Sequence, residues 1–146
     1  MSRVSTYLNF MGKTEAAFEF YRTAFGGDFV GVFMRMGDMP SDPNMPQMSD
    51  AEKNMIMHVE LAITGGHVLM GTDAIESMGQ QLTFGNNVSI NLEPDSRAET
   101  DQLFAALSAD GTDVMPMQDM FWGAYFGTCC DQFGVRWMFN CYEPKP

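Results

Sequence analysis

The feature that most constrains the fold of this chain is an internal repeat with an offset of 84 residues. Five matched pairs carry it: Ser5 and Ser89, Leu8 and Leu92, Glu15 and Glu99, Phe20 and Phe104, and Gly27 and Gly111. In both copies these positions fall on an extended apolar run, then on a stretch with helical spacing, and then on the glycine that ends it. We therefore predict two similar modules built by duplication.

The first copy reads as a strand, a helix and three further strands. Residues 4–10 alternate like a strand, Thr14 can cap a helix that ends at Gly26-Gly27, and residues 28–36 read as a second strand. Residues 37–53 are rich in Pro, Asp and Ser, which predicts a long loop, either mobile or folded over something.

The second copy repeats this order. It contains a strand over residues 88–92, a helix capped by Asp95 or Ser96, and a hairpin-like pair over residues 125–140. The expected fold class is α+β, with paired β-α-β-β-β modules at residues 4–73 and 86–142 inside a single domain of residues 1–146. Their curved mixed sheets are expected to enclose one cavity.

The hairpin on either side of Gly65-Gly66 predicts which side chains face that cavity. Two glycines supply the positive φ angles of a two-residue turn. Such a turn pairs Glu60 with Gly71 and His58 with Asp73, because side chains alternate along each strand. The opposite, apolar face is expected to lie under helices; it carries Val59, Leu61, Ile63, Val68, Met70 and Thr72.

The composition excludes several kinds of partner. Eight basic and 19 acidic residues give a formal net charge of −11, so we expect neither nucleic acid nor an anionic membrane as a partner. The chain has no run of 18 apolar residues and no signal-peptide core at its start, which predicts a cytoplasmic protein. Charged residues make up only 18% of the chain against about 25% in typical domains, which favours a homo-oligomer.

Three segments resemble a known family. The strings YLNFMGKTEAAFEFYRTAFGG, MHVELAITGGHVLMGTD and FWGAYFGTCCDQFGVRWMFN are similar, in order and spacing, to the signature blocks of the PhnB-like branch of the vicinal-oxygen-chelate superfamily. That superfamily includes glyoxalase I, bleomycin-resistance proteins and extradiol dioxygenases, and PhnB-like proteins often carry a 3-demethylubiquinone-9 3-methyltransferase name. The resemblance implies paired βαβββ modules, a cavity in each curved sheet, and a homodimer.

The resemblance also implies where a metal would be held. Metal-dependent members of the superfamily use four side chains, usually His and Glu, and the corresponding positions here are Ser5, Leu69, Ser89 and Met138. Two hydroxyls, a thioether and an alkyl group do not make a good site for a divalent metal. We therefore predict no metal and no cofactor. No glycine-rich turn suited to S-adenosylmethionine accompanies the methyltransferase name.

Other polar residues on the expected cavity face are candidates for ligand contacts. His58, oriented by Asp73, is the first candidate for a catalytic base and Glu60 the second. His58 also fits a structural histidine at the sheet edge that is hydrogen-bonded to Asp73. Together, His58, Glu60 and Asp73 offer an alternative metal set. Arg136 either anchors an anion or forms a solvated pair with a nearby carboxylate. The remaining ligand-binding candidates are Tyr7, Asn9, Asp73, Asn91, Trp122 and Asn140.

Methionines gather in and beside the long loop. Seven of the 15 lie between Met34 and Met57, a pattern that fits either an adaptable apolar lid or a Cu(I) site. The sequence thus predicts a protein that binds a small organic molecule in its sheet cavity without the superfamily's metal. The alternative is a glyoxalase- or dioxygenase-type enzyme with a non-standard metal site around His58 and Glu60.

Overall fold

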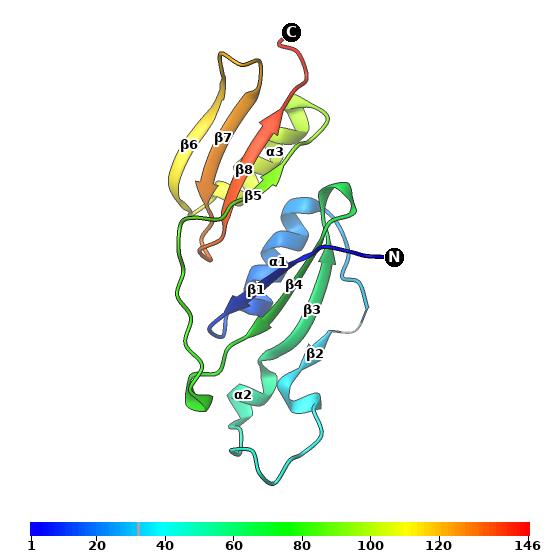
Figure 1. Ribbon diagram of the computed structural model, residues 1–146, viewed down its shortest axis with the longest axis vertical. Helices are drawn as coiled ribbons and strands as arrows, with labels where there is room; N and C mark the ends of the chain where they lie inside the picture. Colours follow the sequence, from blue (N-terminus) through cyan, green and yellow to red (C-terminus); the bar gives the residue numbers. More distant parts are fainter. Residues whose placement is uncertain (32) are drawn as a thin grey trace. The chain divides into compact units, whose positions relative to one another are not determined.

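The chain folds into two compact units, Met1–Thr83 and Phe84–Pro146 (Figure 1). A computed structural model describes residues 1–31 and 33–146. Each unit holds one four-stranded mixed sheet and the element order β-α-β-β-β. The α+β class and the paired modules are therefore confirmed. Within the described residues, no helix has both the length and the apolar character needed to cross a bilayer.

The first unit has a sheet with the strand order β1-β4-β3-β2. Strand β1 runs parallel to β4, and the other pairs are antiparallel. Its elements are β1 (Thr6–Phe10), α1 (Thr14–Phe25), β2 (Met34–Arg35), α2 (Asp50–Asn54), β3 (Ile56–Ala62) and β4 (Val68–Asp73).

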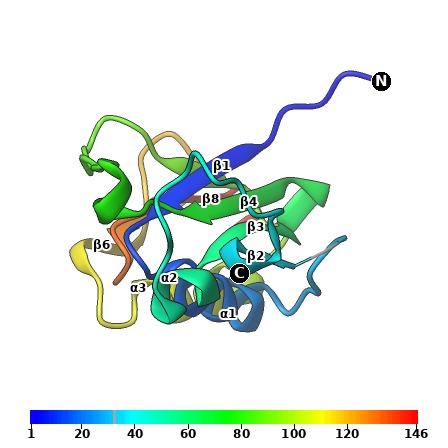
Figure 2. The ribbon, with the colours of Figure 1, turned by 90° about the horizontal axis from the view of Figure 1, so that it is seen from below.

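Helix α1 covers one face of this sheet (Figure 2). Ala17, Phe18 and Tyr21 are fully buried at helical spacing, so the apolar stripe of the helix faces the sheet. Gly71 of β4 makes the approach possible, because a Cβ atom there would lie 2.4 Å from the Phe18 ring. As predicted, the helix ends at Gly26, whose left-handed backbone lets its N–H reach the carbonyl of Arg22.

The second strand of the first unit is shorter than the predicted span of residues 28–36. Only Met34–Arg35 pairs with β3, and Phe29 makes an isolated bridge to Leu61. Gly31 has a positive φ of 71°, which interrupts an extended run. Val32 lies outside the described residues.

The predicted loop over residues 37–53 is folded and anchored at its base. A backbone hydrogen bond of 2.8 Å from the Met36 N–H to the Met55 carbonyl closes it. Its last part forms α2, which Ser49 and Glu52 cap reciprocally. The Arg35 guanidinium also joins the loop to α1, because it donates to both Glu15 carboxylate oxygens and to the Asn54 carbonyl.

The second unit repeats this plan with the strand order β5-β8-β7-β6. Helix α3 packs on one face, where Phe104 meets Phe139 edge to face at 5.3 Å and Trp137 is fully buried. The hairpin predicted over residues 125–140 is confirmed. The elements are β5 (Ile90–Leu92), α3 (Arg97–Ser108), β6 (Thr112–Asp119), β7 (Tyr125–Cys130) and β8 (Arg136–Cys141).

Candidate functional site

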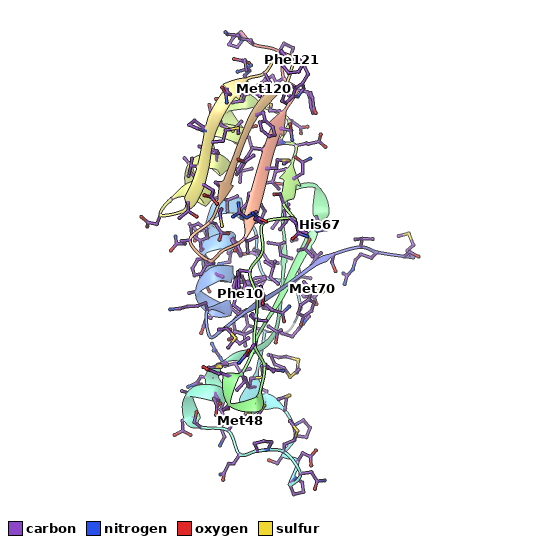
Figure 3. The ribbon with its side chains drawn as sticks, turned by 60° about the vertical axis from the view of Figure 1, so that its left-hand side comes forward. Phe10, Met48, His67, Met70, Met120 and Phe121 are labelled. Carbon is purple, nitrogen blue, oxygen red and sulfur yellow. The ribbon has the colours of Figure 1, made fainter. Side chains whose placement is uncertain are left out.

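The face of the first sheet opposite α1 carries the candidate site. Alternation along β1 places Tyr7 and Asn9 on this open face, and the register pairs Tyr7 with Met70 and Asn9 with Thr72. On the other side of β4, Met70 is paired with Glu60 of β3. Met70 is labelled in Figure 3.

Tyr7, His58 and Glu60 form a connected chain of polar contacts on this face. The Tyr7 hydroxyl lies 2.9 Å from His58 Nδ1, and His58 Nε2 lies 3.4 Å from Glu60 Oε2. The tyrosine is 47% exposed, and the histidine and glutamate side chains are 28% and 23% exposed. A small molecule in contact with the sheet can therefore reach all three groups.

The electrostatics of these three side chains favour one arrangement of their protons. A carboxylate beside Nε2 favours the tautomer that carries its proton there, so Nδ1 accepts a hydrogen bond from the Tyr7 hydroxyl. Burial and the charge of Glu60 raise the pKa of Tyr7 above its ordinary value. Tyr7 therefore stays protonated at neutral pH. The lone pairs of the Tyr7 hydroxyl oxygen can therefore accept a hydrogen bond from a ligand.

The predicted partnership of His58 and Asp73 is wrong. The turn between β3 and β4 holds three residues, Thr64–Gly66, and a hydrogen bond from the Ile63 N–H to the His67 carbonyl closes it. The register therefore shifts by one residue, and Glu60 faces Met70 instead of Gly71. A one-residue shift turns every side chain of β4 to the other face.

Asp73 consequently lies on the buried side of the sheet and is only 4% exposed. One carboxylate oxygen accepts hydrogen bonds from the backbone N–H and the hydroxyl of Thr14, at 3.0 and 2.7 Å. The other accepts from the Ile56 N–H at 2.8 Å. The alternative metal set of His58, Glu60 and Asp73 is therefore not assembled.

The same shift corrects one superfamily metal position. Leu69 is fully buried on the helix side, and Met70 takes its place on the open face, where the Ser5 hydroxyl donates to its sulfur at 3.7 Å. The corrected positions in this unit hold a hydroxyl and a thioether, which do not suit a divalent metal. In the part of the chain that the structure describes, no three His, Cys, Asp or Glu side chains gather as metal ligands do.

The candidates in the second unit form separate contacts. Asn140 donates to Asn91 across the β5–β8 pair at 2.6 Å, and the Trp122 ring lies 5.8 Å from Phe126. Arg136 donates to the Asp113 carboxylate at 2.9 Å, as expected for a solvated pair. Its Nε atom is buried without a partner among the described residues.

Sequence reasoning missed two features of the first unit. It did not connect Tyr7 to His58, although both were candidates, because the wrong register supplied Asp73 as the partner of the histidine. It also missed the role of Met70. Thr64, directly before Gly65-Gly66, was the available signal for the longer turn. Three-residue hairpin turns with glycine in the left-handed region are common.

Comparison with known proteins gives this fold a family. The family model described as 3-demethylubiquinone-9 3-methyltransferase matches residues 2–139. The chain belongs to this family. It is also 30% identical to the protein YjdN of Escherichia coli K12 over 98% of this chain and 97% of that protein.

Solved structures share the fold of this PhnB-like chain. Protein PA1353 from Pseudomonas aeruginosa is 34% identical with a TM-score of 0.79, over 97% of this chain and 98% of that chain. The PhnB protein from Bacillus cereus is 25% identical with a TM-score of 0.73, over 96% and 99%. A glyoxalase, bleomycin-resistance protein and dioxygenase domain from Frankia shares the fold at 12% identity, with a TM-score of 0.60 over 97% and 95%.

Proposed function

We propose that this PhnB-like protein binds a small organic molecule on the open face of its first sheet, without the metal of the superfamily. The observation that carries the proposal is the chain of contacts from Tyr7 through His58 to Glu60. Three partly exposed polar groups with fixed proton positions can orient a ligand that carries a hydroxyl or amide donor.

A ligand screen by saturation-transfer NMR tests this proposal. Neutral fragments that carry hydroxyl or amide groups are expected to bind the full chain and to bind at least about tenfold more weakly to Tyr7→Phe and His58→Ala, the loss of one or two hydrogen bonds. Thr128→Val in the second unit is the matched control and should leave binding unchanged. Equal binding to all four proteins would remove the proposed site.

Elemental analysis tests the metal-free part of the proposal. Protein purified without chelator and without nickel affinity resin is expected to hold far less than one metal ion per chain. A stoichiometric content of Zn, Ni, Fe or Mn would instead support the metal-dependent enzyme.

The same contacts favour proton transfer as a second candidate function. In this step a ligand O–H or acidic C–H bond gives its proton to the Tyr7 oxygen while the Tyr7 proton passes to His58 Nδ1. The ligand becomes the anion, and Glu60 stabilises the imidazolium. Carbonyl fragments in D2O should then incorporate deuterium at acidic C–H positions with the wild type and not with His58→Ala. No incorporation with any bound fragment leaves binding alone as the function.

We also propose that the protein is a cytoplasmic homodimer. The low charged fraction of 18% and exposed apolar side chains such as Val88 and Phe121 support the dimer. Sedimentation equilibrium should give twice the chain mass of 16.3 kDa. A mass of one chain at micromolar concentration would contradict this assignment.

A further inference from the structure

A pocket of about 570 Å³ lies in the first unit, at the end of strands β1 and β4. Four methionines line it: Met36, Met39, Met45 and Met78. We call this the methionine pocket. Ile75 and Leu82 add further apolar wall. Its volume is in the range of small-molecule sites.

The walls of the methionine pocket are held in place by hydrogen bonds outside it. Three of the four methionines belong to the loop that the bond from Met36 to Met55 closes. The fourth, Met78, follows Ser77, whose hydroxyl donates to the Glu52 carboxylate of α2. This contact joins the loop to the segment after β4, and so connects the two segments that carry the four methionines.

The lining determines the charge of a ligand. No Lys, Arg or His side chain is among the described residues that line the pocket. Of the lining residues that the structure describes, only Asp73 is ionisable, and both of its oxygens already accept hydrogen bonds from Thr14 and Ile56. An anionic ligand would therefore lose its hydration and gain no cationic partner.

The methionine side chains favour an aromatic ligand. Thioether side chains are flexible and polarisable, and they make favourable contacts with aromatic rings. Asn9 and Thr72 supply a polar margin where the pocket meets the open face of the sheet. We propose that the methionine pocket binds an uncharged aromatic molecule. The described lining of the pocket does not include Tyr7, His58 or Glu60, so this inference goes beyond the function proposed above.

A pair of fluorescent probes tests the proposal on the full chain. N-phenyl-1-naphthylamine is uncharged, and 8-anilino-1-naphthalenesulfonate has the same ring system with one sulfonate. The uncharged probe is expected to bind saturably with one site per chain and at least tenfold more tightly than the sulfonate. No saturable binding of the uncharged probe, or equal or tighter binding of the sulfonate, overturns the proposal.

Substitutions test whether the uncharged probe binds in the methionine pocket. Met39→Glu puts a charge in the pocket wall and should weaken binding of the uncharged probe at least tenfold. Met115→Glu, at an exposed position of the second unit, is the matched control and should leave binding unchanged. Loss of binding in Tyr7→Phe but not in Met39→Glu would assign the probe to the open face and overturn the proposal.

A measurement on the unsubstituted chain tests the proposal even if Met39→Glu does not fold. Methionine methyl groups labelled with carbon-13 are followed by NMR during the titration. The signals of Met36, Met39, Met45 and Met78 are expected to shift together. Shifts confined to other methionines overturn the proposal.

Discussion

The two units carry the same sheet but present different chemistry on its open face. In the first unit Met70 lies between Tyr7 of β1 and Glu60 of β3. His58 lies two residues before Glu60, on the same face. Three side chains of titratable type therefore lie around one methionine.

The second unit has the equivalent register around Met138. This residue lies between Asn91 of β5 and Thr128 of β7, and Phe126 lies two residues before Thr128. An amide, a hydroxyl and a phenyl ring thus occupy the positions of the tyrosine, the glutamate and the histidine. The two units share the scaffold, whereas at these three compared positions titratable side chains are present only in the first unit.

The units also differ in how their helices begin. Helix α3 is capped locally, because the Ser96 hydroxyl accepts a hydrogen bond from the Glu99 N–H at 3.1 Å. Helix α1 has no local side-chain cap. The carboxylate of Asp73 on β4 accepts from the first helical residue, Thr14, instead. The start of α1 therefore depends on a strand 59 residues further along the chain.

The largest expected effect follows from removal of this distant cap. Asp73→Ala leaves the Thr14 N–H, the Thr14 hydroxyl and the Ile56 N–H without their acceptor in the core. We expect a loss of about 3 to 5 kcal/mol in the free energy of unfolding. Urea denaturation measures it, and amide exchange should become faster at the start of α1 while α3 keeps its protection. Faster exchange in α3 to the same degree would contradict the distinction between the two caps.

A second effect concerns cysteine, which occurs only in the second unit, at positions 129, 130 and 141. Burial, aided by the charge of Asp131, raises the pKa of Cys129 to about 12. Unfolding restores an ordinary thiol pKa, so the folded state holds this proton more tightly. Stability is complete below the ordinary thiol pKa and should fall as pH rises toward 12. Urea denaturation from pH 8 to 11 checks this, and Cys129→Ala should flatten the dependence; an unchanged slope would contradict the assignment.

Loss of the local cap is expected to cost less. Ser96→Ala should lower the free energy of unfolding by about 1 kcal/mol, the usual value of a serine N-cap. Amide exchange should become faster at the start of α3 and remain unchanged at the start of α1. A cost as large as that of Asp73→Ala would show that the two helix starts are equally dependent on their caps.

The smallest effect is expected for the ion pair between Glu15 and Arg35. The hydrogen bond from Arg35 lowers the pKa of Glu15, so its stabilisation is present above the ordinary glutamate pKa and is lost as pH falls through the lowered value. Glu15→Gln should cost less than about 1 kcal/mol at pH 7 and nothing near pH 2. Glu99→Gln, at the matched repeat position, should cost nothing at either pH, because Glu99 has no ion pair among the described residues.

The sequence predicted the elements well where the signal is local. Gly26 ends α1, Ser96, one of the two predicted caps, caps α3, and the hairpin of β7 and β8 turns where Phe133-Gly134 indicated. The cap predicted at Thr14 is wrong, because Thr14 is the first helical residue and its own N–H needs the distant Asp73 as acceptor. The repeat predicted two units of the same element order correctly, because each matched position depends on its immediate neighbours in the chain. These features arise from backbone preferences that a short window of residues contains.

The candidate site was only partly predictable, because its contacts join residues that are distant in the sequence. The identities of Tyr7, His58 and Glu60 were available from alternation along β1 and β3. Their contacts were not, because one extra residue in the turn, Thr64, decides which face of β4 meets the site.

The sequence by itself thus determined two β-α-β-β-β units, their apolar helix faces and the family to which the chain belongs. Only the tertiary structure decided that Asp73 caps α1 and that His58 contacts Tyr7. Only there do methionines from a distant loop join Met78 around one pocket. Local preferences act between near neighbours, whereas strand register depends on a single turn residue and brings together groups more than 50 residues apart.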